Sequence, residues 1–205
     1  MKEEIVIASN NEGKIKEVQE ILNEYIIISM KEIGIEINVK EDQNTFEKNA
    51  IKKAEIISQK LKGKKCLADD SGIEIEYLNG FPGVYTKRWH EGTDRERNMA
   101  ILDKLKNVPK EKRKIRFVTA IAISDGNNTI SAQGSINGYV AKNIRGENGF
   151  GFDEIFELEN GKTLAELTKE EKNKISARKI ALENLKNKLR ISWQDVLFFD
   201  KNKRK

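Results

Sequence analysis

The sequence has 205 residues, of which 38% are hydrophobic and 35% charged, and it holds only 2 prolines and 14 glycines, which excludes a fibrous or disordered chain. Its single cysteine, Cys66, excludes an internal disulfide and a metal site with several cysteines. No apolar run is long enough to span a membrane, no signal peptide opens the chain, and the net charge of +5 is spread over alternating basic and acidic residues. We therefore expect a cytoplasmic protein with neither nucleic acid nor a membrane as its partner.

The first third of the chain alternates between strand-like and helix-like segments. Apolar residues with period two or in short runs predict strands, and apolar residues every three or four positions predict helices. A polar turn between the first strand and the first helix indicates an α/β unit. The expected elements are a strand over Glu4–Ala8, a helix from about Lys14, one or two strands within Ile26–Ile28 and Ile35–Val39, and a helix over Thr45–Leu61.

The rest of the chain is dominated by strands and ends in a helical segment. The expected elements are a short strand over Cys66–Ala68 ending at two aspartates, a strand over Ile73–Leu78, a helix over Arg95–Lys106, a hairpin of Ile115–Ser124 with Thr129–Val140, and a helix over Lys169–Leu189, followed by an extension at 190–205. This order predicts one domain over 1–205, with an elongated mixed α/β sheet and two lobes around a cleft.

The turn Ser9–Lys14 is the first candidate site. It joins a strand to a helix, so free backbone N–H groups and the positive end of the helix dipole meet there. Ser9 and Asn11 add hydrogen-bonding side chains, and Lys14 adds a full charge. This chemistry suits a phosphate chain, but a capped helix with an exposed lysine explains the pattern equally well.

Two adjacent carboxylates, Asp69 and Asp70, form the second candidate site. They follow an apolar strand, and a buried carboxylate needs a partner such as Mg²⁺, which prefers oxygen ligands. Neighbouring residues of a strand point to different sides, so the two are expected to have different roles. Glu41 and Asp42 are candidates for a further ligand. A turn capped by aspartate is an equally weighted alternative.

Two further segments contain candidate binding residues. The loop Gly149–Asp153 sets two aromatic rings among glycines, where a ring can stack on a base, and Asp153 can accept hydrogen bonds from a purine. The alternative is that the rings are core residues. In the last helix, Lys172, Ser176 and Lys179 share a face, with Arg178 close by, although a simple charged helix has the same composition.

Taken together, these motifs resemble the inosine triphosphate pyrophosphatase family over nearly the whole chain, from Ile5 to about Leu189. The specific segments are Ala68-Asp69-Asp70-Ser71-Gly72-Ile73-Glu74, Leu78-Asn79-Gly80-Phe81-Pro82-Gly83-Val84-Tyr85, Gly149-Phe150-Gly151-Phe152-Asp153 with Phe156, and Ala165-Glu166-Leu167 with Glu171-Lys172-Asn173-Lys174-Ile175-Ser176.

The resemblance implies a homodimeric, Mg²⁺-dependent enzyme that splits the bond between the α and β phosphates of non-standard purine nucleoside triphosphates (ITP, dITP and XTP). The products are the nucleoside monophosphate and pyrophosphate. It implies that Ser9, Asn11 and Lys14 hold the triphosphate and that Ser71 lies beside the substrate. Asp70 would be the general base and a metal ligand, with Asp69 in support, and Glu41 would be a second metal ligand. Phe150, Gly151, Phe152 and Asp153 would form the pocket for the nucleobase, and Lys172 and Arg178 would reach the nucleobase or the phosphates.

Two positions depart from the family pattern. Ala177 stands where the family has a base-recognising histidine before Arg178, and alanine can neither donate nor accept a hydrogen bond. Lys48 stands where the family usually has glutamate, a role that Glu47 or Glu41 can take instead. His90, on another segment, is interpreted as a surface or dimer-contact residue. The alternative function is therefore a nucleotide-binding protein with weakened or altered base selectivity.

Overall fold

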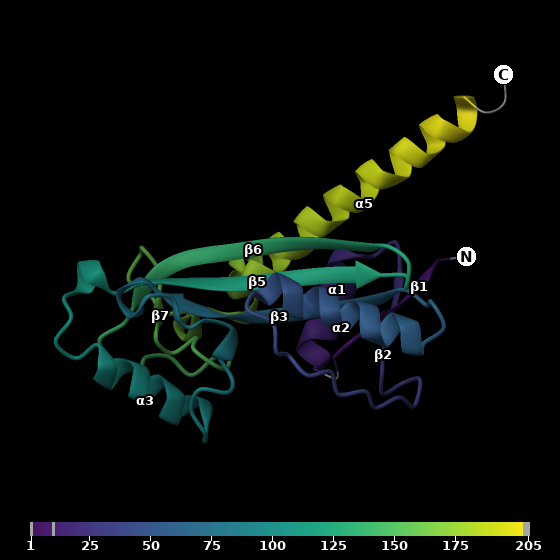
Figure 1. Ribbon diagram of the computed structural model, residues 1–205. Coiled ribbons are helices and arrows are strands. Elements are labelled where there is room, and N and C mark those ends of the chain that lie inside the picture. Colours follow the sequence, from purple (N-terminus) through teal and green to yellow (C-terminus); the bar gives the residue numbers. More distant parts are fainter. Residues whose placement is uncertain (1, 10, 203–205) are drawn as a thin grey trace.

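The computed structural model describes residues 2–9 and 11–202, with side chains as far as residue 190. A seven-stranded sheet runs through the described residues in the order β2-β1-β3-β5-β6-β7, and β4 pairs with β3 (Figure 1). The strands are β1 (Glu4–Ile7), β2 (Ile26–Ser29), β3 (Cys66–Ile75), β4 (Phe81–Pro82), β5 (Lys114–Ser124), β6 (Thr129–Val140) and β7 (Phe156–Glu157). The helices are α1 (Glu12–Ile21), α2 (Phe46–Lys60), α3 (Asp94–Lys104), α4 (Lys169–Ile175) and α5 (Ala177–Asn202).

The sheet is mixed, as expected. β1 pairs in parallel with β2 and with β3, whereas β3, β5, β6 and β7 pair antiparallel. β5 and β6 form the expected hairpin, paired from Ser124 and Thr129 at the turn to Lys114 and Tyr139 at the far end. These two long strands run through the whole length of the body (Figure 1).

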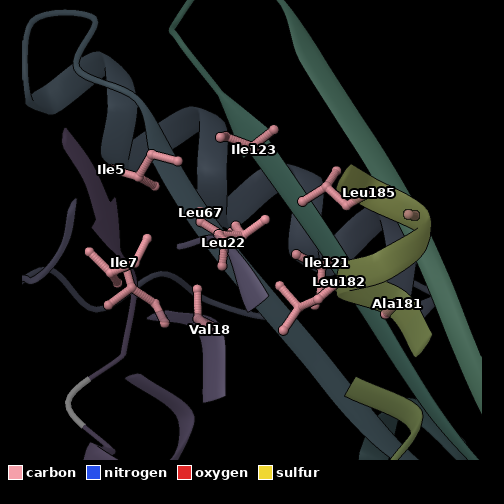
Figure 2. Close-up of a cluster of buried hydrophobic side chains, with 12 residues drawn as sticks. Ile5, Ile7, Val18, Leu22, Leu67, Ile121, Ile123, Ala181, Leu182 and Leu185 are labelled. Atoms are coloured by element: carbon pink, nitrogen blue, oxygen red, sulfur yellow. The ribbon is translucent and has the colours of Figure 1, made fainter. Parts of the chain in front are cut away.

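Alternate residues of β3 and β5 pack against different helices, because side chains of a strand alternate between its faces. On one face, small residues such as Ala68, Ala120 and Ala122 allow α2 to pack closely through Ala50 and Ala54. On the other face, larger residues meet α1 and α5 (Figure 2). That cluster includes Ile5, Ile7, Val18, Leu22, Leu67, Ile121, Ile123, Ala181, Leu182 and Leu185.

A second cluster lies at the other end of the sheet and includes Ile73, Ile75, Ile101, Leu105 and Phe156. It joins α3 to the far halves of β3 and β5. The molecule therefore has two lobes on one continuous sheet, which confirms the elongated two-lobed architecture expected from the sequence. Within the described residues, none of the helices is long and apolar enough to cross a membrane.

Three expected boundaries were wrong. β3 does not end at the aspartates but continues to Ile75, because it pairs with β5 over its whole length. After Ile75 the chain forms a short 3₁₀ turn over Glu76–Leu78 in place of strand. The segment 35–39 is not a strand, and its Ile37 and Val39 pack against the core beside Val6 and Ile57.

The final helical segment is also interrupted, at Ser176. α4 ends at Ile175, Ser176 has an extended backbone with ψ of 141°, and α5 begins at Ala177. The Ser176 hydroxyl accepts a hydrogen bond from Lys179 N, 3.0 Å away, so it caps the new helix. The extension expected at 190–205 continues α5 as far as Asn202, beyond the body of the molecule (Figure 1), and residues 203–205 lie outside the described part.

Candidate active site

The site is built at a gap in the sheet beside β3. β1 pairs with β3 only at Cys66 and Leu67, and β4 pairs with it only at Glu74 and Ile75. Between these pairings, residues 69–72 have no strand beside them on that edge within the described chain. Ligands of α/β sheets bind where neighbouring strands end or diverge. The gap therefore gives a ligand access to the middle of the sheet.

Side chains from α2 and from the segment after β4 border this gap. Lys53 Nζ donates to the Asp69 carbonyl at 2.9 Å, and the Thr86 hydroxyl accepts from Ile73 N at 3.1 Å. Thr86 packs so closely that a Cβ on Gly72 would lie 2.2 Å from its hydroxyl oxygen. The sequence Asp-Ser-Gly therefore ends in glycine because only a hydrogen fits there.

Asp69 points toward α1 and α5 and is held by two cations. Lys14 Nζ donates to its carboxylate oxygens at 3.1 and 2.8 Å, and Arg178 lies 3.4 Å away. Its side chain is only 7% exposed. Burial raises the pKa of Asp69, but the charges of Lys14 and Arg178 outweigh it and hold that pKa well below its ordinary value. Asp69 is therefore a fixed anion that organises two cations.

Asp70 points to the opposite face, toward α2. Asn49 Nδ2 donates to one of its carboxylate oxygens at 2.9 Å, and Ser71 N donates to the other at 2.9 Å. Burial raises the pKa of Asp70, and the nearby negative charge of Glu41 raises it further. A carboxylate with a raised pKa is a better proton acceptor than an ordinary one. The two side chains thus point to opposite faces of β3, as strand alternation predicted.

Glu41 lies in the loop before α2 and forms an ion pair with Lys53. No group of three or more His, Cys, Asp or Glu side chains able to hold a metal occurs among the described residues. Glu41 lies close enough to Asp70 for its negative charge to raise the pKa of Asp70. Mg²⁺ commonly binds one or two carboxylates and takes phosphates and water as its other ligands. The donor set fits that ion when a phosphate chain is also bound.

The neighbours of Asn49 do not join this group. Glu47 accepts hydrogen bonds from the Ser131 hydroxyl and from Gln133 Nε2 on β6, so the idea that it replaces the family glutamate is wrong. Lys48 is exposed. Of the two residues considered as replacements for the family glutamate at position 48, Glu41 remains.

The Ser9–Lys14 turn forms the start of α1 as expected. Asn11 caps the helix by accepting from Lys14 N at 3.1 Å, and the Ser9 hydroxyl accepts from Asn11 N at 3.2 Å. The side chain that leaves this turn is that of Lys14, which reaches Asp69. Asn11 therefore caps the helix, and Lys14 reaches the site at Asp69.

A cleft of about 290 Å³ lies between α1 and the segments that include α4 and the start of α5. Among the predicted site residues, Asn11, Lys14, Phe150, Lys172 and Arg178 line it. Ser9, Ser71, Asp70 and Glu41 lie outside this lining, and Asp69 is joined to it through Lys14 and Arg178. Cationic side chains and an exposed ring thus share one cavity.

The Gly149–Asp153 loop divides its two rings between different environments. Phe150 is 59% exposed, with Lys172 Nζ 4.7 Å from its ring centroid. Phe152 is 5% exposed and packs in the second hydrophobic cluster, so its expected place in the base pocket was wrong and the core alternative was right. Asp153 is buried and accepts from Phe150 N and Lys172 Nζ, so it shapes the loop.

The break at Ser176 changes what the last helices present. Ser176 and Arg178 line the cleft, whereas Lys179, expected on the same face, forms an ion pair with Glu183. Ala177 is only 3% exposed and is not in the cleft lining. His90 is half-buried and packs edge-on against Trp89 at 5.1 Å.

Three residues of the site were not predicted. Glu17 accepts from the Ser176 hydroxyl at 2.6 Å and from Arg178 at 3.0 Å, and Asn49 and Lys53 contact Asp70 and Asp69. Helical spacing contains the missing signal: Glu17 is one turn after Lys14, and Lys53 is one turn after Asn49.

The fold and site define a class of protein: a two-lobed α/β protein with a carboxylate pair at a break in the sheet and a cationic cleft beside it. Residues 5–188 match the model of the Ham1 family. The chain belongs to that family, which confirms the resemblance found in the sequence.

Similar proteins cover nearly the same length. A dITP/XTP pyrophosphatase of Clostridium perfringens (strain 13 / Type A) is 44% identical over 196 residues, covering 90% of this chain and 96% of that protein. A dITP/XTP pyrophosphatase of Bacillus subtilis (strain 168) is 45% identical over 188 residues, covering 89% and 94%. The structure of a HAM1 protein from Coxiella burnetii superposes with a TM-score of 0.83 at 37% identity, covering 91% of this chain and 98% of that one.

Proposed function

We propose that this protein hydrolyses non-standard purine nucleoside triphosphates (ITP, dITP and XTP) between the α and β phosphates, releasing the monophosphate and pyrophosphate in the cytoplasm. The observation that carries the proposal is the difference between the surroundings of two adjacent aspartates. Asp69 holds Lys14 and Arg178 at the cleft, and Asp70 lies with a raised pKa at the gap in the sheet. The dITP/XTP pyrophosphatases that share 44% and 45% identity with the chain support the substrate class.

The reaction assigns each group a role. The purine ring of the nucleotide lies in the cleft against the exposed Phe150 ring. The phosphate chain extends from Lys14 and Arg178 toward the gap beside β3. Asp70, oriented by Asn49, accepts the proton of a water directed at the α phosphorus. Lys14 stabilises the negative charge that develops on the leaving pyrophosphate. Ser9 and Ser71, outside the cleft lining, are assigned to the phosphates that cross this gap.

Asp70 and Glu41 are the proposed ligands of Mg²⁺, which would offset the charge of the triphosphate. The support is their proximity, because Lys53 Nζ bonds both to Glu41 and to the carbonyl of Asp69, the residue before Asp70. Lys53 Nζ thereby keeps the loop with Glu41 at a fixed separation from β3.

Asp70→Asn tests the proposal, because the amide keeps the size and hydrogen bonding of the side chain but cannot accept the proton. We expect pyrophosphate release from ITP to fall by at least about a hundredfold, with nucleotide binding largely retained in a calorimetric titration. Asp103→Asn, at an exposed position on α3, is the matched control. Turnover of Asp70→Asn close to the wild type would show that the mechanism is wrong.

We also propose that the chain forms a homodimer. The large side chains Tyr77 and Tyr85, 52% and 61% exposed, lie on the short turns on either side of β4 and are suited to contact a second copy. Analytical ultracentrifugation should give twice the mass of one chain, and Tyr77→Ser with Tyr85→Ser should shift the protein toward the monomer. A monomeric wild type at micromolar concentration would contradict this proposal.

A further inference from the structure

Helix α3 holds the backbone of the aromatic loop from both sides at one residue, Gly151. Gly151 N donates to Asp94 Oδ2 at 2.8 Å, and the Gly151 carbonyl accepts from Asn98 Nδ2 at 3.0 Å. Asp94 and Asn98 are four residues apart on α3, so their side chains lie one above the other on the same helix face. Two neighbouring side chains thus satisfy both polar groups of a single loop residue.

These contacts are not needed to form the helix. α3 is capped by Thr93 and Glu96, which form a reciprocal capping box. Asp94 is fixed by Arg97, 2.8 Å away, and Asn98, which is fully buried, donates a second hydrogen bond to Glu154 at 3.0 Å. The two side chains therefore have defined orientations, and both are directed at the loop.

Gly151 separates the buried ring from the exposed ring. Its φ of +66° is in the left-handed region, which favours glycine, and no atom lies within 4 Å of a Cβ built there. Phe152, on one side, is packed in the core, and Phe150, on the other, lines the cleft. With Phe152 fixed in the core and Phe150 N bonded to Asp153, the hydrogen bonds at Gly151 fix the residue that joins the two rings and so contribute to where the Phe150 ring lies.

We propose that Asp94 and Asn98 are positioning residues that hold the Gly149–Asp153 loop so that the Phe150 ring faces the base of a bound nucleotide. The inference rests on the proposed function, because it assumes that the base binds beside Phe150. α3 then belongs to the substrate-binding apparatus although neither side chain lines the cleft. The contacts from α3 therefore affect binding of the nucleobase and not of the phosphates.

The test compares ligands with and without a base. We expect Asp94→Ala to raise the KM for ITP and the Kd of inosine monophosphate by roughly tenfold, the size expected for a lost charge-assisted hydrogen bond. The Kd of inorganic pyrophosphate and the kcat should stay within about twofold. Asp94→Asn, whose amide oxygen can still accept from Gly151 N, should largely restore binding. Asp103→Ala, on the same helix and exposed, is the control.

Several outcomes would overturn the inference. These are an unchanged affinity for inosine monophosphate in Asp94→Ala, an equal loss of affinity for pyrophosphate, or no recovery in Asp94→Asn. The Asp94 side chain is 50% exposed, so its removal leaves the fold intact, and thermal unfolding verifies this. Failure of the proposed function can be told apart from failure of this inference. In the first case the wild type releases no pyrophosphate, whereas the affinities of the wild type and Asp94→Ala for inosine monophosphate can still be compared.

Discussion

Asp69 and Asp70 are adjacent in the chain, but they act in different surroundings because they project from opposite faces of β3. Asp69 is paired with Lys14 and Arg178, and removing it would take the carboxylate from the largely buried Lys14 and leave Arg178 with Glu17. Asp70 has an amide and a backbone N–H as partners and a second carboxylate nearby, so it is the group of the pair suited to accept a proton.

Ala177 is the position where base selectivity is most directly testable. Ala177 is 3% exposed and stands between Ser176 and Arg178, both of which line the cleft. We expect Ala177→His to raise the preference for ITP over ATP in kcat/KM by about fivefold, the effect of one added hydrogen bond. An unchanged ranking of nucleotides, in a variant that unfolds at the wild-type temperature, would contradict the role given to this position.

At the scale of residues, the resemblance to a family singled out Lys14, Asp69, Asp70, Phe150, Lys172 and Arg178, because the chemistry of each segment alone left a plain structural alternative open. It could not separate Phe150 from Phe152. Both rings occupy similar sequence surroundings, and only the αL turn at Gly151 decides which one enters the core. Glu17 was missed because a glutamate on a charged helix looks like any solvated residue.

Helix α5 is the element whose placement most affects the cleft, since its first turn bears Arg178. It approaches β6 closely at Gly134, where a Cβ would lie 2.3 Å from the Ala177 carbonyl oxygen and 2.4 Å from Ala181 N. Both of these atoms are backbone, so they cannot yield by a change of rotamer. The glycine in β6 therefore fixes the distance between the helix and the sheet.

Gly134→Ala tests this contact. Overpacking of this kind costs about 1–3 kcal/mol, so the melting temperature should fall by roughly 2–4 °C for each kcal/mol. The KM for ITP should also rise as Arg178 moves. Gln133→Ala alters the adjacent residue, whose side chain is exposed and bonded to Glu47 on the other face of the sheet, and should change neither property. Equal stability of the two variants would show that α5 does not depend on this glycine.

The elements were predictable where local pattern determines them, as in α2 and the β5–β6 hairpin. They were not predictable where a partner far along the chain decides. β3 continues through two aspartates because ten residues of it pair with β5. At the helix break, the Ser176 hydroxyl both caps the new helix and donates to Glu17, 159 residues earlier in the chain, and this second contact has no local signal.

For the molecule as a whole, function depends on the relation of the two lobes to the gap between them. β5 and β6 run through both hydrophobic clusters, so the sheet holds α1 and α3 in fixed positions on the same face. In the proposed function, the lobe with α1 supplies Lys14 for the phosphates, and the lobe with α3 holds the loop with Phe150. This arrangement followed from the predicted order of elements, but the position of the gap did not, because it depends on where β1 and β4 stop.

The most direct test of the account is a product analysis of ITP, XTP, dITP, ATP and GTP hydrolysis by the wild-type protein, with Mg²⁺ and with the metal chelated. We predict that ITP, XTP and dITP each yield the monophosphate and pyrophosphate in equal amounts, faster than ATP or GTP, and only with the metal. Release of a nucleoside diphosphate with inorganic phosphate, or no product from any nucleotide at high protein concentration, would contradict the central claim.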